Sequence, residues 1–380
     1  MDIDAIVTEV AAAVGLAEGE AGVRDVLRVV ARGEPAPTSQ VSRTAELPVP
    51  IVTAVCNELR KRGVIDRTRP ISLTAQAREL LAGRHIDGRC PYCDGLGLLV
   101  PGELKSLADE LELVARDAPQ ARPELDQTHC TVATKIHRVL KLHDSGALDS
   151  KRIILLGDDD LISVAIARFA GLTGVGAKAV TVVDTDRAVL DWIGEQVAGM
   201  GITLVEHDLR RPLPDDLAGS FDVACTDPPY TVHGAGLFLS RAVAALRPGP
   251  GQHVFFSFGA RRPAEMLATQ RLIADLGLVI RSLTPNFNSY VGAGILGSSS
   301  HLYHLRSTEQ TAPLTDGDYA GPLYTADTRT EQTRPYRCAD CGAVHAVGTG
   351  APWLTIAELK AASCPACGGT TFRPMPRGQR

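Results

Sequence analysis

The sequence predicts an α/β protein in which a doubly wound parallel sheet follows a helical domain and precedes a metal-binding tail. Three observations support this prediction. Short apolar strands alternate with amphipathic helices in the middle of the chain, apolar residues recur at helical spacing before it, and six of the nine cysteines fall in C-x-x-C pairs. We therefore expect a helical domain, a connector, a sheet domain, a linker and a tail at residues 1–85, 86–128, 129–308, 309–330 and 331–380.

The first segment has the pattern of a winged helix. Helical periodicity covers Ile3–Leu16, Val23–Val30 and Ile51–Leu59, and the short strand-like runs Val64–Thr68 and Ile71–Thr74 follow. The alternative is a plain helical cap. Winged helices often bind DNA, but they also serve as dimerisation or substrate-covering modules, and the acidic balance of this chain disfavours DNA.

The sheet domain is indicated by seven short apolar runs. One helix, Glu103–Asp117, is expected in the connector before it, and two more are expected after its first two strands, at Leu161–Ala170 and Ala188–Met200. Strands alternating with helices imply a parallel, doubly wound sheet. The predicted strands are Arg152–Leu156, Ala179–Val183, Thr203–Glu206, Phe221–Ala224, His253–Phe258, Val279–Leu283 and His301–His304.

The tail carries the clearest metal signal. Cys338/Cys341 and Cys364/Cys367 form two C-x-x-C pairs, each of which aims two thiolates at one point. Together they predict a closed, structural zinc ribbon whose folding energy comes from the metal. The linker before it is rich in turn-forming residues.

The pair Cys90/Cys93 is half of such a site. Its missing ligands could be His85, Cys130 or the same pair of a second subunit. A redox pair and two buried thiols are the alternatives.

Composition excludes several classes of protein. Hydrophobic residues make up 44% and charged residues 22% of the 380-residue chain, which excludes wholesale disorder. The net charge of −5 disfavours nucleic acid and anionic membranes as partners. We find no signal peptide, no apolar run near the roughly 20 residues that span a bilayer, and a cysteine pattern typical of a reducing compartment. We therefore expect a cytoplasmic protein.

Three carboxylates follow the first predicted strand. The segment Gly157-Asp158-Asp159-Asp160 stands where ligands of such sheets bind, at the carboxyl end of a strand. A dinucleotide pyrophosphate would be repelled there, whereas a cationic or sulfonium ligand would be favoured. The alternative is that the aspartates cap the next helix.

Acidic residues also end the second and third strands. Asp184, with Asp186 two residues later, is at the position where a carboxylate accepts hydrogen bonds from ribose hydroxyls. Asp208 follows the third strand, where a carboxylate can reach an adenine amino group.

The fourth strand leads into Asp227-Pro228-Pro229-Tyr230. The prolines stiffen the loop and remove two N–H donors, so carbonyl groups and the Asp227 carboxylate offer only acceptors. This chemistry suits the orientation of an attacking amine, and Tyr230 can pack against the substrate.

Seven carboxylates should therefore surround one crevice, with two or three of them turned to solvent. They would repel one another unless a polycation or a sulfonium neutralised them, so we expect a cationic substrate. They are Asp158, Asp159, Asp160, Asp184, Asp186, Asp208 and Asp227.

Two further segments are candidates for the crevice. Asn286-Phe287-Asn288-Ser289-Tyr290 follows the sixth predicted strand and offers amide and aromatic contacts, or is an ordinary turn. Glu124-Leu125-Asp126-Gln127 precedes the helix before the first strand and either covers the crevice or caps that helix.

The order of these motifs resembles the branched-chain polyamine synthases, the N4-bis(aminopropyl)spermidine synthases of thermophilic archaea and bacteria. The resemblance covers about residues 1–305, and its most specific element is the acidic triple. The stretches concerned are Glu124–Gln127, Gly157–Leu161, Asp184–Asp186, Asp208–Arg210, Thr226–Pro229 and Asn286–Asn288.

The resemblance implies a Rossmann-like, methyltransferase-type fold and aminopropyl transfer from decarboxylated S-adenosylmethionine to a polyamine, with release of methylthioadenosine. With the strand-end chemistry above, the expected catalytic residues are Asp158, Asp159, Asp227 and Tyr230, and the expected donor-binding residues are Gly157, Asp160, Asp184, Asp208 and Pro228. Asp126, Asn286 and Asn288 are expected at the acceptor. We also expect a homodimer.

Two rival functions remain open at this point. The D-P-P-Y loop resembles that of enzymes that methylate amino groups with S-adenosylmethionine, although three carboxylates would repel the carboxylate of that cofactor. A non-enzymatic regulator would use the winged helix and the zinc ribbon, but the intact acidic rim argues against it.

Overall fold

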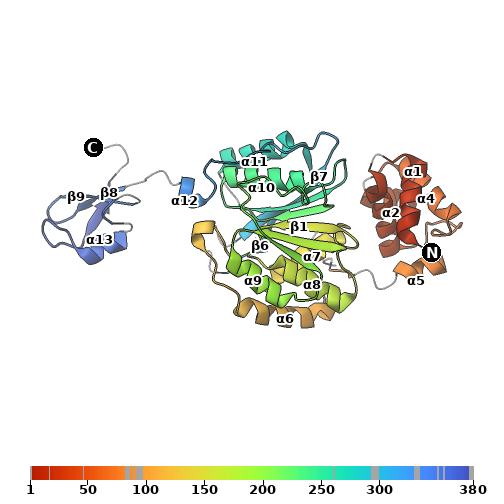
Figure 1. Cartoon of the computed structure of the whole chain (residues 1–380), viewed down its shortest axis with the longest axis horizontal. Coiled ribbons are helices and arrows are strands. Elements are labelled where there is room, and N and C mark those ends of the chain that lie inside the picture. The colour runs from red at the N-terminus through yellow and green to blue at the C-terminus, as the bar shows by residue number, and fades with distance from the viewer. Residues whose placement is uncertain are drawn as a thin grey trace. The chain divides into compact units, whose positions relative to one another are not determined.

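The chain folds into two compact units, Met1–Gly321 and Pro322–Arg380, which divide inside the predicted linker (Figure 1). The computed structural model describes residues 2–16, 18–45, 47–81, 86–88, 90, 97–259, 262–291, 299–328, 334–348, 351–353 and 356–375.

A seven-stranded sheet forms the centre of the first unit, in the order β3-β2-β1-β4-β5-β7-β6. The strands β3, β2, β1, β4 and β5 pair in parallel, as predicted. All seven predicted strands are present, with boundaries shifted by a few residues. Their bounds are Arg152–Leu156 (β1), Ala179–Asp184 (β2), Ile202–Glu206 (β3), Val223–Thr226 (β4), His253–Phe258 (β5), Leu278–Ser289 (β6) and Ser299–Ser307 (β7).

The prediction of an all-parallel sheet is wrong for the last two strands. Strand β7 pairs antiparallel with both β5 and β6. Residues 290–298, which connect β6 to β7, are too few for the helical crossover of about a dozen residues that a parallel pair needs. Strand β6 also runs on to Ser289, so the segment from Asn286 lies mostly within a strand and not after one.

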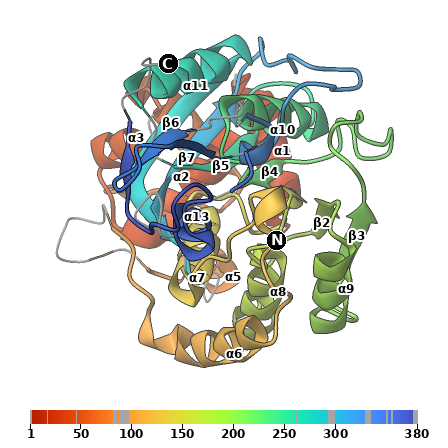
Figure 2. The same ribbon diagram turned by 90° about the vertical axis from the view of Figure 1, so that its left-hand side faces the viewer.

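Helices cover both faces of the sheet. Figures 1 and 2 show α10 and α11 on one face and α6, α7, α8 and α9 on the other. Because side chains alternate along a strand, Ile153 and Leu155 of β1 pack with the second group, and Ile154 and Leu156 pack with the first. The helices are Lys105–Arg116 (α6), Val132–Asp144 (α7), Ile162–Thr173 (α8), Arg187–Gln196 (α9), Val232–Ala245 (α10) and Pro263–Asp275 (α11).

Both segments that flank the sheet domain pack onto it. Leu107 and Leu111 of α6 are buried in the same core as α7 and α8, so the predicted connector contributes to that core. On the other side of the sheet domain, the segment after β7 is bound by Arg241, a buried residue of α10. Arg241 donates hydrogen bonds to the carbonyl oxygens of Thr315 and Gly317 in that segment, both at 2.7 Å. The first half of the predicted linker is therefore held against α10.

The N-terminal part is helical with two isolated antiparallel bridges. Its apolar core is separate from those of the sheet. The bridges join Ala36 to Ile71 and Ile65 to Leu73. The helices are Ile3–Val14 (α1), Gly19–Gly33 (α2), Thr38–Ala45 (α3), Val49–Lys61 (α4) and Ala75–Leu81 (α5).

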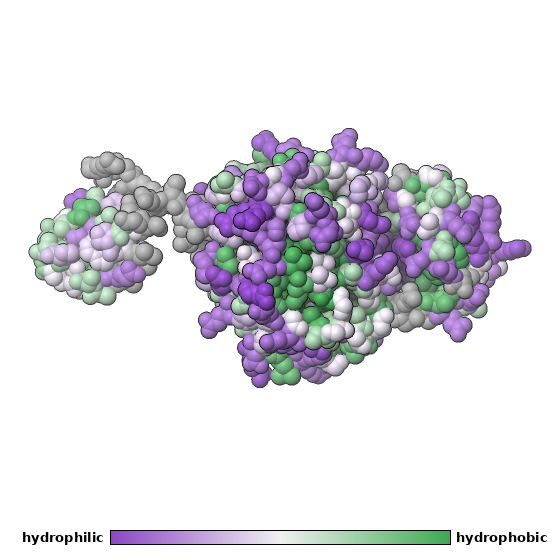
Figure 3. All heavy atoms as spheres, viewed as in Figure 1, coloured by the Kyte–Doolittle hydropathy of each residue, from purple (hydrophilic) through white to green (hydrophobic). Residues whose placement is uncertain are grey.

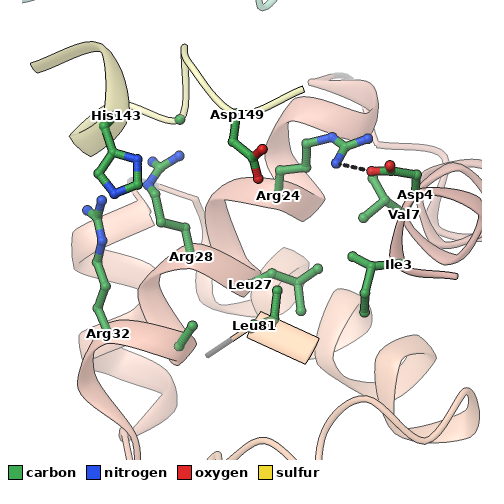
Figure 4. Close-up of a pocket in the computed structure, with 12 residues that line it drawn as sticks. Ile3, Asp4, Val7, Arg24, Leu27, Arg28, Arg32, Leu81, His143 and Asp149 are labelled. Carbon is green, nitrogen blue, oxygen red and sulfur yellow. Dashed lines mark hydrogen bonds and ion pairs between the residues drawn. The ribbon is translucent and has the colours of Figure 1, made fainter. Parts of the chain in front are cut away.

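A cavity of about 140 Å³ lies between these helices and the end of α7 (Figure 4). Arg32 of α2 forms an ion pair with Asp144 at 2.7 Å, and Figure 4 shows Arg32 and Arg28 close to His143. Burial and the nearby arginine lower the pKa of His143 to about 4, so this ring is neutral. The cavity shares no lining residue with the acidic loops described below.

The described part of the second unit is a small three-stranded sheet in the order β10-β8-β9 with two short helices, of which α13 is the longer. Its core contains only a few buried side chains, two of them cysteines. The elements are Thr325–Thr328 (α12), Arg334–Cys338 (β8), Val344–Val347 (β9), Ile356–Ala362 (α13) and Phe372–Pro374 (β10).

No helix in the part of the chain that the structure describes is both long and apolar enough to cross a bilayer. On the face shown in Figure 3, hydrophilic residues predominate, and apolar residues gather over the middle of the first unit.

Candidate active site

The predicted acidic loops meet at the carboxyl edge of the parallel strands. Strand β1 lies between β2 and β4, so the loops that follow these three strands are neighbours. This arrangement places ligands at the edge where strand order reverses. A cavity of about 30 Å³ lies there, lined by residues of α7, of the loops after β1 and β4, and of β5 and β7.

Asp158 organises the start of α8. Its carboxylate accepts hydrogen bonds from the backbone N–H groups of Ile162 (2.7 Å) and Ser163 (3.1 Å). Burial raises the pKa of Asp158 to about 7. The capping interpretation therefore describes this aspartate, although it also lines the cavity.

Asp160 is buried and held by cations from α7. Its Oδ2 accepts a hydrogen bond from Arg138 Nη1 at 2.7 Å, and its backbone carbonyl accepts one from Lys135 Nζ at 2.5 Å. Burial alone would raise the pKa of Asp160, but these two cations outweigh it and lower the pKa. Asp160 is thus ionised and paired within the protein.

Asp227 has one occupied and one open oxygen. Its Oδ2 accepts hydrogen bonds from Tyr290 Oη (2.6 Å) and Arg138 Nη2 (2.8 Å). Its Oδ1 is buried and has no hydrogen-bond partner among the described residues. Burial raises the pKa of Asp227 to about 6, although Arg138 counteracts this effect.

Asp159 is the half-buried member of the acidic triple. Its Oδ2 accepts a hydrogen bond from the backbone N–H of Thr128 at 3.0 Å. Burial and the charges of Asp160 and Asp227 raise its pKa well above the ordinary value. The loops therefore contain carboxyl groups whose pKa values are shifted in opposite directions, which is typical of acid–base sites.

Asp184 joins the loops to each other. It accepts hydrogen bonds from the backbone N–H groups of Asp158 (3.0 Å) and Asp186 (2.8 Å), and burial raises its pKa. Asp186 in turn caps α9 through the N–H of Ala188.

Asp208 lies apart from this network. Arg210, two residues along the chain, binds both of its oxygens. Burial would raise the pKa of Asp208, but the hydrogen bonds from Arg210 lower it.

The expectation that two or three of the seven carboxylates face solvent is wrong. Asp158, Asp160, Asp184 and Asp186 are buried, and the other three are partly buried. Backbone N–H groups and arginines, which the sequence pattern did not include, take up most of their oxygens.

The segment that contains Asp126 lies along the edge of the site. It forms a short 3-10 turn, Pro123–Leu125, and Asp126 ends that turn at a φ of 57°. The next residue, Gln127, donates a hydrogen bond to Asp186 at 3.1 Å. Thr131 is the N-cap of α7, so the capping interpretation is wrong, and the covering one stays a prediction.

The two expected acceptor asparagines are in different surroundings. Asn288 is fully buried, and its amide is bound to Arg138, Ser257 and Ser300. Asn286 is exposed, and its Oδ1 accepts a hydrogen bond from Ser299. The structure therefore brings neither amide to the cavity lining.

The remaining predicted residues lie beside Asp227 or Asp158. Pro228 is buried, and Tyr230 is half-buried with its ring edge-on to Tyr290 at 6.5 Å. Gly157 lines the cavity with a φ of 77°, a conformation that favours glycine.

Sequence reasoning missed the basic side of the site. Lys135 and Arg138 lie one helical turn apart on α7, and Arg138 contacts Asp160, Asp227, Asn288 and Tyr290. A signal was present, because both basic residues stand where the apolar stripe of an amphipathic helix should be.

The four tail cysteines converge in the second unit. Their sulfur atoms all lie within 4.8 Å of one another, and Sγ of Cys338 and Cys367 are 3.7 Å apart, as are those of Cys341 and Cys364. The edge of a tetrahedron with Zn–S bonds of about 2.3 Å measures about 3.8 Å. The donor set therefore fits zinc.

The structure describes one cysteine of the second pair, Cys90/Cys93. Cys90 is half-buried, whereas Cys93 and its candidate partner His85 lie outside the described residues. Cys130, the other candidate, is buried with its Sγ 3.7 Å from Lys135 Nζ.

Comparison with known proteins identifies the middle of the chain. Residues 106–311, over half of its length, match the model of the branched-chain polyamine synthase A C-terminal domain. An uncharacterized protein of Methanocaldococcus jannaschii is 32% identical over 98% of this chain and 93% of its own length. The N(4)-bis(aminopropyl)spermidine synthase of the same organism is 31% identical over 66% of this chain and 72% of its own length.

A solved structure has the same fold. The branched-chain polyamine synthase of Thermus thermophilus, crystallised with N4-aminopropylspermidine and 5′-methylthioadenosine, covers 85% of this chain and 98% of its own length. The TM-score is 0.54 and the sequence identity is 24%.

Proposed function

Because the chain belongs to the branched-chain polyamine synthase family, we propose that it transfers aminopropyl groups from decarboxylated S-adenosylmethionine to an amine nitrogen of a polyamine. 5′-Methylthioadenosine would be the other product. One observation carries the proposal: several carboxyl groups surround one cavity, and a buried carboxylate oxygen, Asp227 Oδ1, has no partner among the described residues. Such an oxygen suits an amine that must lose a proton.

The proposed reaction needs a base and a fixed geometry. The amine nitrogen forms a bond to the propyl carbon beside the sulfonium, the carbon–sulfur bond breaks, and the nitrogen loses a proton. An amine with a pKa of about 10 is protonated at neutral pH, so a carboxylate must accept its proton. Asp227, with a pKa of about 6, is ionised at pH 7.5 and can do so. Asp159, which is half-buried and lines the same cavity, would hold a second amine group of the polyamine.

The donor would lie along the turn after β1. Gly157 leaves space beside the backbone, where a Cβ would lie 3.8 Å from Phe238. We propose that Asp184 binds the ribose hydroxyls, since each of its oxygens keeps a second lone pair. Asp208 can reach an adenine amino group only if it releases Arg210.

The test is product formation with a defined donor. The protein would be incubated with decarboxylated S-adenosylmethionine and with putrescine, spermidine or spermine in turn, and methylthioadenosine would be measured by chromatography. We expect methylthioadenosine together with an aminopropylated amine for at least one acceptor. Ordinary S-adenosylmethionine, tested in parallel, should give no methylated amine, because its carboxylate would face the acidic loops. Methylation without aminopropyl transfer would favour the rival function.

The second unit has a separate proposed role for its cysteines. We infer that Cys338, Cys341, Cys364 and Cys367 bind one zinc ion that stabilises this small sheet. Four thiolates complete a tetrahedral shell and leave no position for substrate, so the ion would be structural. His345 Nε2, 3.2 Å from Cys364 Sγ, is placed to donate a hydrogen bond to that thiolate.

Two further assignments are proposals for the N-terminal part. Its helices and two antiparallel bridges support a winged helix. We propose that it serves in covering the substrate or in homodimer formation and not in binding DNA. Sedimentation of the full chain would give the oligomeric state, and a gel shift with random duplex DNA at physiological salt should show no binding.

A further inference from the structure

Five side chains form a closed ring of hydrogen bonds behind Asp227. Arg138 Nε donates to Asn288 Oδ1 (2.7 Å), and Asn288 Nδ2 donates to Ser300 Oγ (2.9 Å). Ser300 Oγ lies 2.8 Å from Tyr290 Oη, which donates to Asp227 Oδ2 (2.6 Å). Arg138 Nη2 closes the ring on the same Oδ2 at 2.8 Å.

The ring joins four parts of the fold and is almost entirely enclosed. Arg138 comes from α7, Asn288 and Tyr290 from β6 and its end, Ser300 from β7, and Asp227 from the loop after β4. Asn288 is 0% and Ser300 1% exposed, so neither can reach a substrate. A buried polar network in which the members satisfy one another fixes a single geometry.

The ring leaves Asp227 with one open oxygen. Two donors, Tyr290 and Arg138, occupy Oδ2, while Oδ1 has no partner among the residues that the structure describes. We propose that Arg138 is a positioning residue for aminopropyl transfer, which holds Asp227 so that Oδ1 alone receives the acceptor nitrogen. This inference rests on the proposed function.

The charge of Arg138 also acts on Asp227. The charged and titratable groups around that carboxylate are Asp159 and Asp160 from the loop after β1, Arg138 from α7, Tyr290 directly after β6, and Tyr230 from its own loop. Burial and Asp160 raise the pKa of Asp227, and Arg138 lowers it. Loss of the cation should therefore raise the pKa of Asp227. As pH is lowered, the base of the variant then becomes protonated at a higher pH than that of the wild type, and activity is lost at that higher pH.

Two substitutions separate geometry from charge. Arg138→Lys keeps a cation but loses the planar guanidinium that reaches four partners, and Arg138→Met removes the cation. Arg168→Lys is the matched control, because Arg168 pairs with Glu110 on the far side of α8 from the acidic loops. Melting curves would establish that each variant is folded.

We expect kcat of Arg138→Lys to fall about 100-fold while KM for the donor stays within about threefold, because misplacement of a base by 1 Å costs about that much. In Arg138→Met the acid limb of the kcat profile should move up by at least one pH unit. Arg168→Lys should match the wild type in both. Arg138 variants with wild-type kcat and wild-type pH profiles would overturn the proposal.

A second measurement does not depend on activity. Aspartate labelled with ¹³C at the carboxyl carbon gives one resonance per aspartate, and Asp227→Asn would identify that of Asp227. Its titration midpoint should rise in Arg138→Met, and an unmoved midpoint would contradict the proposal even if activity fell. If the midpoint rose but the wild type transferred aminopropyl groups to no amine, the proposed function would fail while the effect of Arg138 on Asp227 stood.

Discussion

At the scale of single residues, Asp159 and Asp227 differ in the state that the fold gives them. Asp227 faces Arg138, whereas among the described residues the main neighbours of Asp159 are the carboxylates of Asp160 and Asp227 and the backbone N–H of Thr128, and its pKa is raised well above the ordinary value. Because its pKa is raised, Asp159 keeps its proton to a higher pH, and a cation that binds beside it would favour the carboxylate and displace that proton.

This difference predicts that a polyamine releases a proton when it binds. At pH values near and below the raised pKa of Asp159, spermidine binding should release protons, and Asp159→Asn should abolish this release. Titration calorimetry in phosphate and in Tris measures it, because the two buffers take up protons with different enthalpies. Equal proton release in the variant and the wild type would contradict the assignment.

Asp158 should make the protein less stable as pH rises. Its folded pKa of about 7 lies above its unfolded value near 3.9, so the folded state holds an extra proton between these values and its stability is lost as pH rises through 7. Asp158→Asn has no such proton. Urea unfolding at pH 5 and pH 8 should show the variant gaining on the order of 2 kcal/mol relative to the wild type over this interval. A constant difference between the two proteins would contradict the raised pKa.

The aspartates could be predicted from sequence because each follows an apolar run at a strand end. Their partners could not. In the sequence, Arg138 is one of several polar residues in an amphipathic helix. Its partner Asp227 is 89 residues further along the chain. Asn288 was expected at the acceptor, but it is buried because β6 extends to Ser289. The sequence alone does not show that extension, and without it a buried asparagine cannot be distinguished from an exposed one.

At the scale of elements, the parallel strands could be predicted because each is a short apolar run separated from the next by a helix. The β6–β7 hairpin could not. Strand β6 mixes exposed and half-buried residues without regular alternation and has register shifts at Ile280/Ser282 and Thr284/Asn288, so its continuation beyond Leu283 has no clear period of two. That continuation brings Asn288 and Tyr290 to Arg138.

Helix α7 delivers Arg138 and Lys135 to the site, and its N-cap is Thr131, whose Oγ1 accepts a hydrogen bond from the N–H of Thr134. Thr131→Ala should lower the free energy of unfolding by about 1 kcal/mol, because the N–H loses its acceptor. Thr131→Ser keeps the hydroxyl and should retain most of the stability. Urea unfolding of the full chain measures both, and equal losses in Ala and Ser would show that the cap is not the cause.

At the scale of the whole molecule, two relatives from one organism align with different shares of this chain. The uncharacterized M. jannaschii relative aligns over nearly the full chain, whereas the named synthase of that organism aligns over two thirds of it. The alignment with the first relative therefore extends over most of the second unit, Pro322–Arg380.

The tail should depend on its metal, because so few apolar side chains support it. Among the described residues its core has five buried side chains, and two of these belong to the proposed ligands Cys338 and Cys364. Removal of zinc from the full chain with a strong chelator should therefore make residues 322–380 sensitive to protease while the first unit stays resistant, and Cys364→Ser should lose the metal measured by atomic emission.

Cys90→Ser is the control, and we expect it to keep the tail's zinc, since Cys90 belongs to the other unit. A Cys364→Ser protein with a full zinc content and a resistant tail would show that the four cysteines are not the site. Catalysis by the first unit should not fall in parallel with the loss of zinc, because the carboxylates around Asp227 belong to the first unit and have their own hydrogen-bond partners.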